Sequence, residues 1–180
     1  MRRQLRRQRR SIPIAARRLL SARIAEHLLA LDRLRDVQRA GLYAETDRTA
    51  EVGTGEIHRL LRTRGIEIAY PRVVGDQLAF FAVSERSDLA CGFRDIPEPA
   101  SGASPIAITA LDLIIVPGLG FSRQGHRLGQ GGGHYDRTLA GCGGALAIGL
   151  AFDLQVLERV PTAPHDLPVS LVITESGVLS

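Results

Sequence analysis

The sequence predicts an α/β fold, with a single three-layer domain (1–180), a mostly parallel central sheet and helices on both faces. Three observations support this prediction. The run Leu113–Val116 is continuously apolar and rich in branched residues, as in a strand buried on both faces. A strand–helix–strand pattern with short links spans 42–70. Apolar runs continue to residue 174, and no repeat or low-complexity linker interrupts them. A chain of 180 residues is long enough for one sizeable core.

The first long helix is expected after Ser11, which can cap it, with Pro13 tolerated in its first turn. Apolar residues then recur at intervals of four, four and three, which is the spacing of one helix face. These positions are Leu20, Ile24, Leu28 and Leu31. The sequence therefore predicts an amphipathic helix that packs its apolar face on the core.

A βαβ unit is expected next. A short strand begins at Leu42–Ala44, Thr54 is placed to cap a helix, and Gly65 ends that helix. The segment Ile66–Tyr70 then reads as a buried strand stopped by Pro71. Short links between these elements predict two parallel strands joined by a right-handed crossover.

The remaining elements follow in order. Leu78–Val83 is predicted as a strand, and 84–110 as a long connection over the surface, because it carries Gly, Pro and Ser with little periodicity. Leu113–Val116 is the predicted central strand. A helix is expected from Tyr135, and two further strands over 145–152 and 169–174 complete the sheet.

The composition is that of an ordinary soluble globular protein, with 44% hydrophobic and 23% charged residues. No apolar run approaches the length of a membrane span, which is about 20 residues. The two cysteines, Cys91 and Cys142, give no disulfide framework and no metal or redox spacing. These features predict a cytoplasmic protein with no membrane partner, and nothing in the sequence indicates an obligate protein partner.

The first ten residues contain six arginines and no acidic residue. Three interpretations compete: a transit peptide, a nucleic-acid-binding arm, and a helix whose arginines meet an anionic ligand. We expect the third, with no nucleic-acid partner, because the net charge of the whole chain is only +4 and it contains just eight aromatic residues. Some of these arginines are expected only to solvate a helix face.

The segment most informative about function is a glycine cluster that follows the predicted central strand. Seven glycines fall between Gly118 and Gly133, and a helical pattern follows them. Such loops turn backbone N–H groups toward an anion, and the next helix adds its positive end. Arg127 would add a bidentate phosphate partner, and Asp136 an oxygen ligand for magnesium. The order of residues in the cluster fits neither a P-loop nor a dinucleotide-binding fingerprint. The alternative to an anion-binding loop is a surface Ω-loop.

The residue order in this cluster is Arg-Leu-Gly-x-Gly-x-Gly, then one residue, then Tyr-Asp. This order favours an anion-binding loop over a surface Ω-loop. It resembles the signature of the 5-formyltetrahydrofolate cyclo-ligase family, also called methenyltetrahydrofolate synthetases. The resemblance covers nearly the whole chain in order, and the length agrees. The other matching segments are Arg2–Arg6, Glu51–Thr54, Pro71–Arg72, Phe93–Pro99 and Asp166–Val169.

The resemblance implies ATP- and Mg²⁺-dependent conversion of 5-formyltetrahydrofolate to 5,10-methenyltetrahydrofolate, with release of ADP and phosphate. It implies catalytic roles for Arg127, Tyr135 and Glu51. It implies nucleotide contacts from Arg2, Arg6, Arg127, Leu128, Gly129, Gln130, Gly131, Gly132, Gly133, His134 and Tyr135. Folate contacts are implied for Glu51, Ala44, Gln130, Gly131, Gly132, Gly133 and His134, and magnesium ligands are implied at Asp136 and Asp166.

Three departures from the family pattern bear on the substrate contacts. Ser122 stands where the family commonly has aspartate, His134 replaces an aromatic residue, and the loop 43–51 is about two residues longer. Other roles stay open as well: Asp136 as a helix-capping carboxylate, Asp166 as part of a turn, and His134 as an exposed loop residue. At the level of function, the alternatives are a non-catalytic nucleotide- or folate-binding protein and a basic RNA-associated protein.

Overall fold

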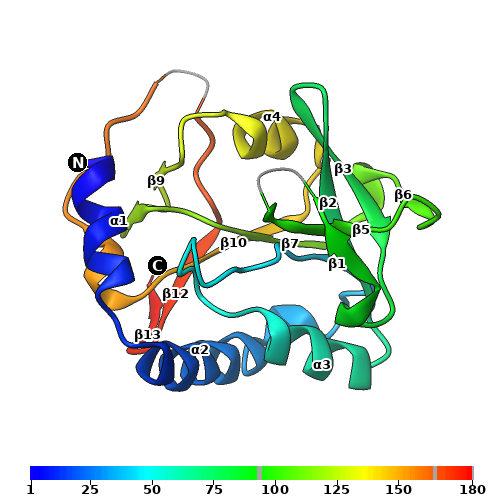
Figure 1. The fold of residues 1–180 in the computed structure, drawn as a ribbon, viewed down its shortest axis with the longest axis horizontal. Coiled ribbons are helices and arrows are strands. Elements are labelled where there is room, and N and C mark those ends of the chain that lie inside the picture. Colours follow the sequence, from blue (N-terminus) through cyan, green and yellow to red (C-terminus); the bar gives the residue numbers. More distant parts are fainter. Residues whose placement is uncertain (93–94, 164–165, 180) are drawn as a thin grey trace.

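A computed structural model describes residues 1–92, 95–163 and 166–179 of the chain. An eight-stranded sheet runs through it in the order β13-β12-β10-β7-β1-β2-β3-β6 (Figure 1). Its central strands β12, β10, β7, β1 and β2 are parallel, and β13, β3 and β6 add antiparallel edges. These strands are β1 Arg39–Gly41, β2 Glu67–Val74, β3 Gln77–Ala82, β6 Pro105–Ile106, β7 Leu113–Val116, β10 Leu146–Leu150, β12 Leu171–Thr174 and β13 Gly177–Leu179.

Helices cover both faces of this sheet, which confirms the predicted layers. The helices are α1 Arg2–Arg10, α2 Ile14–Leu29, α3 Gly55–Thr63 and α4 His134–Gly141. In Figure 1, α2 and α3 lie below the sheet, α4 lies above it, and α1 stands at one side. The predicted βαβ unit is present, because β1 pairs in parallel with β2 across α3.

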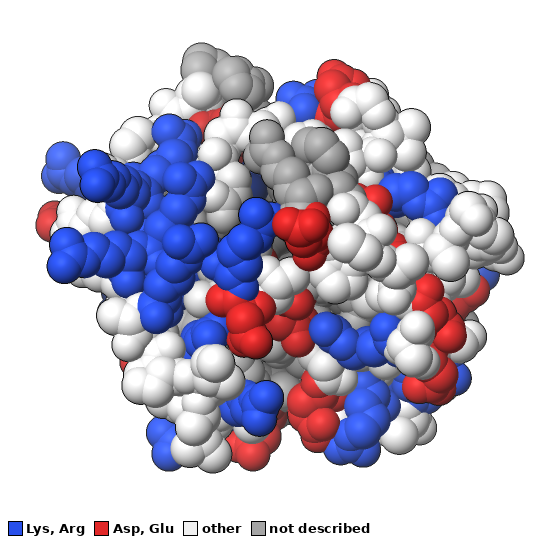
Figure 2. Space-filling view, viewed as in Figure 1, with Lys and Arg blue, Asp and Glu red and all other residues white. Residues whose placement is uncertain are grey.

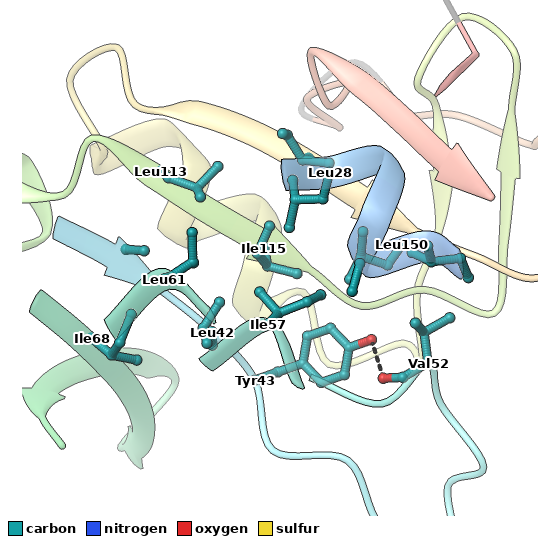
Figure 3. Packing of buried hydrophobic residues seen from close by; sticks show 14 of the residues in the cluster. Leu28, Leu42, Tyr43, Val52, Ile57, Leu61, Ile68, Leu113, Ile115 and Leu150 are labelled. Carbon is teal, nitrogen blue, oxygen red and sulfur yellow. Dashed lines mark hydrogen bonds between the residues drawn. The ribbon is translucent and has the colours of Figure 1, made fainter. Parts of the chain in front are cut away.

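Two apolar clusters fill the spaces between the layers. Below the sheet, Ile24 and Leu28 of α2 are fully buried, as the helical spacing predicted, and Leu20 and Leu31 pack against the same cluster. Figure 3 shows Leu28, Ile57 and Leu61 around the strand residues Leu113 and Ile115. Above the sheet, a second cluster includes Ile114, Val116 and Leu139. All four residues of β7 are buried, as expected of a central parallel strand.

The helix α1 docks through a third, smaller cluster. Leu5 is 4% exposed and packs with Leu119, Leu128 and Val160. This contact confirms that the arginine-rich opening folds as a helix against the domain. Ser11 does not cap α2 as expected, since it follows the last turn of α1 and its hydroxyl donates to the Gln8 carbonyl. Pro13 occupies the N-cap position of α2 instead of its first turn.

Several predicted boundaries were wrong. The first strand is Arg39–Gly41, three residues before the predicted Leu42–Ala44. The Leu42 N–H still bonds the Ala69 carbonyl, after which Tyr43 leaves the sheet and its hydroxyl bonds the Val52 carbonyl (Figure 3). Thr54 precedes α3, but its hydroxyl donates to the Tyr43 carbonyl and does not cap the helix.

The predicted surface connection 84–110 contains structure of its own. It forms the hairpin β4 Leu89–Cys91 with β5 Pro97–Pro99, the edge strand β6, and the short helices η2 Arg86–Asp88 and η4 Ile108–Ala110. Phe93 and Arg94 of the family-like segment lie outside the described residues. The glycine-rich segment also contains short strands, which were not predicted: β8 Gly120–Ser122 pairs with β9 Arg127–Leu128 and with β11 Val156–Leu157. The short helices η1 Asp32–Leu34 and η5 Asp153–Gln155 complete the elements.

No helix among the described residues has both the length and the apolar character needed to cross a membrane. Cys91 is exposed and Cys142 is buried, and both are free thiols, as predicted.

Candidate active site

The predicted site loops meet at the point where the strand order of the sheet reverses. From β1 the chain passes through α3 to β2 on one side, and from β7 it passes through α4 to β10 on the other. The neighbouring strands β1 and β7 therefore lead their following loops to one edge of the sheet. Open α/β sheets bind ligands at this position, beyond the carboxyl ends of the strands. Two surface hollows, which both have Ile66 in their linings, lie at the amino-terminal end of β2. No predicted site residue lines either of them.

The glycine-rich loop depends on glycine where it enters α4. Gly131 has a φ of +105° and Gly133, at the N-cap of α4, a φ of +66°. Residues other than glycine rarely adopt these backbone conformations. At Gly132 an added Cβ atom would lie 2.6 Å from His134 Nδ1. The loop thus brings bare backbone to the first turn of α4, as an anion-binding cradle requires.

Three predicted residues come together beside this loop. The Arg127 Nη2 atom on β9 donates to Asp136 Oδ1 at 2.6 Å, and these side chains are 6% and 21% exposed. The Arg127 guanidinium also lies 5.7 Å from the centre of the Tyr135 ring. Burial raises the pKa of the Tyr135 hydroxyl well above its ordinary value, and the nearby Glu51 carboxylate adds to that rise. Tyr135 is therefore a neutral hydrogen-bonding group over the working pH range.

The helix α1 reaches the same loop with two of its arginines. Arg2 Nε donates to the Gly129 carbonyl at 3.0 Å, and Arg6 Nη2 donates to Gln130 Oε1 at 2.6 Å. Figure 2 shows a dense group of basic side chains over α1. All 23 lysine and arginine side chains of the chain are arginines, Arg2 and Arg6 included.

Glu51 lies at the other half of the site, after β1. Its side chain is 12% exposed and its Oε1 atom is 3.7 Å from Arg9 Nη2. Burial raises the pKa of the Glu51 carboxyl, while the Arg9 charge opposes that rise. Glu51 also raises the pKa of the buried Tyr43 hydroxyl, after the larger effect of burial. The Thr49 side chain hydrogen-bonds this carboxylate and Arg9 lies 3.7 Å away, which leaves further acceptor sites on the carboxylate oxygens for a ligand.

A second polar network lies beside Glu51, at the start of α3. Glu45 Oε2 accepts from the Thr54 N–H at 3.1 Å and lies 2.7 Å from the Thr54 hydroxyl oxygen, and its Oε1 lies 3.0 Å from Arg86 Nη2. Arg86 Nη1 also donates to the Tyr70 hydroxyl, 3.2 Å away. Burial raises the Tyr70 pKa to about 12. This network fixes the loop that carries Glu51.

Several other predicted site residues make contacts within the protein. Leu128 is 4% exposed and packs against α1, while its carbonyl accepts from the Leu119 N–H. Ala44 is 5% exposed, next to Tyr43. Asp166 Oδ2 accepts from the Ala163 N–H at 2.7 Å, as in the turn that was the alternative to a metal site. His134 is the partly buried first residue of α4.

Sequence reasoning missed Arg9, which is 2% exposed and donates to the Gly118 and Thr49 carbonyls. The helical interval of three from Arg6 to Arg9 was the available signal, because it places both side chains on one helix face. Nothing in the sequence pattern indicated the contact between Glu45 and Arg86.

The residues present fit a magnesium ion with few protein ligands. Among the described residues there is no group of three or more His, Cys, Asp or Glu side chains that could hold a metal. Magnesium bound with nucleotide usually takes one or two carboxylates, with phosphates and water completing its shell. Asp136, in the first turn of α4 and partly exposed, has the chemistry of such a ligand.

The fold and the site together define an α/β protein that can hold a phosphate-bearing ligand beside a buried carboxylate. The chain belongs to the 5-formyltetrahydrofolate cyclo-ligase family, whose family model matches residues 1–175. It is 33% identical to the 5-formyltetrahydrofolate cyclo-ligase of Escherichia coli K12 over 116 residues, which make up 63% of each protein. It is 39% identical to the Mycolicibacterium smegmatis cyclo-ligase over 84 residues, 46% of this chain and 42% of that protein. These matches span less than two thirds of either relative.

Solved structures match over more of the chain. The NMR structure of Aquifex aeolicus 5,10-methenyltetrahydrofolate synthetase superposes with a TM-score of 0.86 at 30% identity, covering 98% of this chain and 89% of that one. The synthetase of Mycoplasma pneumoniae superposes with a TM-score of 0.78 at 22% identity, covering 97% and 96% of the two chains, which supports the fold alone.

Proposed function

We propose that this protein is a cyclo-ligase that uses MgATP to convert 5-formyltetrahydrofolate to 5,10-methenyltetrahydrofolate, releasing ADP and phosphate, in the cytoplasm. One observation carries the proposal beyond family membership. The glycine-rich loop with Arg127, and the loop with Glu51, follow neighbouring parallel strands β7 and β1. A phosphate-binding half and a carboxylate-bearing half thus lie side by side, as a phosphoryl transfer to a folate requires.

On the nucleotide side, the backbone of Gly129 to Gly133 and the first turn of α4 would receive the phosphates. Arg2, Arg6 and Arg127 would supply positive charge, the first two from the helix α1. Arg127 is already oriented by Asp136, so little reorganisation is needed when charge develops on the transferred phosphoryl group. A magnesium ion held by Asp136, with Asp166 as a second candidate ligand, would neutralise phosphate charge.

The reaction proceeds in two steps in this proposal. The formyl oxygen attacks the γ-phosphorus, so that an O–P bond forms, the bond to ADP breaks, and an imidate phosphate results. The N10 amine then attacks the formyl carbon, its proton is lost, and inorganic phosphate leaves as the ring closes. Phosphorylation is needed because an amide-like oxygen is a poor leaving group.

On the folate side, Glu51 would accept hydrogen bonds from the pterin or from the reacting amine, and its carboxylate can take the N10 proton. Tyr135 would lie beside the folate as a neutral donor. Ala44, Gln130 and His134 are the further contacts that we propose.

An absorbance assay tests this function. Purified protein with 5-formyltetrahydrofolate and MgATP is expected to produce the near-ultraviolet chromophore of the methenyl product. Omitting ATP or chelating magnesium should stop the reaction. A non-catalytic binding protein would yield no chromophore, and an RNA-associated protein would retain nucleic acid through purification. Turnover that continues without nucleotide would contradict the proposal.

A further inference from the structure

One face of α1 contacts both halves of the site. Arg2, Arg6 and Arg9 follow one another at intervals of four and three, which places them on the same side of the helix. Arg2 and Arg6 contact the glycine-rich loop at Gly129 and Gln130. A shift of α1 would therefore move these arginine side chains together.

Arg9 extends this face into the core of the site. Its Nη1 atom donates to the Gly118 carbonyl at 2.8 Å, in the loop after β7, and its Nη2 atom donates to the Thr49 carbonyl at 2.6 Å, in the loop after β1. The same Nη2 atom lies 3.7 Å from Glu51 Oε1. A single guanidinium thus joins α1 to the two loops that form the site.

The environment of Arg9 is costly for a residue that serves stability alone. Its side chain is 2% exposed, and its Nε atom is buried without a hydrogen-bond partner in the described part of the chain. Buried charges and unpaired donors cost free energy unless a partner compensates them. Glu51 Oε1 lies 3.7 Å from Arg9 Nη2, too far for a tight ion pair, so the Arg9 charge favours ionised Glu51. The carboxylate also takes part in a hydrogen bond with the Thr49 side chain and keeps further acceptor sites for a ligand.

We propose that Arg9 is a positioning residue that couples the nucleotide half of the site to the folate half. Nucleotide bound by Arg2 and Arg6 holds α1 in its docked position, and Arg9 then holds the Glu51 loop and its carboxylate in the form that binds folate. By linkage, folate bound at Glu51 strengthens nucleotide binding by the same factor. This inference rests on the proposed function, because it assigns the two ligands to the two halves.

The charged and polar groups around Glu51 allow a readout that a purely structural role would not change. Arg9 faces it from α1, Glu45 and Tyr43 from the loop after β1, and Tyr135 from α4. Burial raises the Glu51 pKa and Arg9 lowers it. Removing the Arg9 charge should therefore move the acid limb of the folate kcat/KM profile to higher pH.

The test compares Arg9→Gln and Arg9→Lys with the control Arg7→Gln, which removes an exposed charge from the outer side of α1. Calorimetric titrations measure the affinity for 5-formyltetrahydrofolate with and without a non-hydrolysable ATP analogue. We expect the analogue to strengthen folate binding by about fivefold or more in the wild type and in Arg7→Gln. The enhancement should fall to about onefold in Arg9→Gln, with the analogue's own affinity retained.

Arg9→Lys keeps the charge but has no guanidinium fork with which to donate to both carbonyls. We therefore expect it to keep the acid limb of the pH profile where the wild type has it and to lose most of the enhancement of folate binding. This variant also keeps the test usable if the glutamine variant fails to fold. An unchanged enhancement in either Arg9 variant, or an equal loss in Arg7→Gln, would overturn the proposal. A wild type that turns over folate without any enhancement would overturn it too. A wild type that neither binds nor turns over folate would instead refute the proposed function.

Discussion

The two halves of the site are built in opposite ways. The half proposed to bind nucleotide is mostly one continuous segment, in which β9, the glycine-rich loop and the first turn of α4 follow each other from Arg127 to Asp136. The half proposed to bind folate is assembled from separate segments, since Glu51 is surrounded by groups from α1, α4 and its own loop. The first half offers backbone N–H groups and charge near the surface, and the second offers one buried carboxylate.

This difference determines how each half should respond to substitution. In the proposed nucleotide half, several arginines and backbone groups would share the charge of one ligand, so most single changes should weaken its binding without abolishing it. Arg127 is the exception, because it is 6% exposed and ion-paired. In the folate half, a change at Glu51 removes the central acceptor and should leave nucleotide binding intact.

The largest effect is expected from Arg127→Ala. This change removes a charge-assisted contact and leaves Asp136 without its partner at 2.6 Å. A loss of about 2–4 kcal/mol in transition-state stabilisation corresponds to roughly 30- to 1000-fold in kcat/KM for ATP. Steady-state kinetics with varied MgATP measures it.

Asp136→Asn is the companion variant, since it keeps the shape of the side chain and weakens the proposed metal ligand. Its effect should grow as the magnesium concentration falls, and a double-mutant cycle with Arg127→Ala should show strong coupling. If Arg127→Ala lowers the melting temperature while kcat/KM stays within about threefold of the wild type, the ion pair is structural only.

The next effect is expected from Glu51→Gln. Loss of a charged acceptor costs about 1.5–3 kcal/mol, or roughly 10- to 150-fold in kcat/KM for 5-formyltetrahydrofolate, with ATP affinity unchanged when folate is absent. The folate kcat/KM of the wild type should fall as pH is lowered through the raised pKa of Glu51, and this limb should be absent in the variant. The control is Glu56→Gln, an exposed acid on α3. Unchanged folate kinetics in Glu51→Gln would assign Glu51 a structural role.

The sequence predicts most of the fold, because the fold depends on local patterns. The run Leu113–Val116 and the spacing of Ile24 and Leu28 identify a buried strand and a core-facing helix, and both are present. The first strand was misplaced because the apolar Leu42 and Tyr43 continue beyond the sheet. Tyr43 is buried by its own loop, through the bond to Val52, and apolar character alone does not distinguish this burial from a strand.

The same reasoning explains which half of the site could be predicted. Arg127 to Asp136 form a motif that can be read along the chain, and the family resemblance added Glu51. Arg9 could not be found in this way, because its two carbonyl partners lie 40 and 109 residues away in the sequence. The interval of three from Arg6 indicates which helix face Arg9 shares, but it does not indicate that the Arg9 side chain is buried.

A smaller effect should separate the two sides of α1. Arg6→Gln removes contacts to Gln130 and part of the charge facing the nucleotide. Because this region is partly exposed and screened by salt, we expect a loss of about 1 kcal/mol, or roughly fivefold in KM for ATP. Arg3→Gln, on the exposed outer side of the helix, is the matched control and should change KM by less than about twofold. Equal effects from both would mean that the helix attracts nucleotide only by its total charge.

The smallest effect is expected at Ser122, one of the three departures from the family pattern. Ser122 is 2% exposed, and its hydroxyl oxygen accepts from the His126 N–H at 3.2 Å within the β8–β9 turn. Ser122→Ala should therefore cost about 1 kcal/mol of unfolding free energy, because a partly buried N–H loses its partner. The kinetic constants for ATP and folate should stay unchanged, since the side chain faces the turn. Denaturant unfolding and steady-state kinetics on the same preparation test both statements. A loss of folate turnover without a loss of stability would mean that Ser122 contacts the substrate, and the folate half would then extend onto the loop of the nucleotide half.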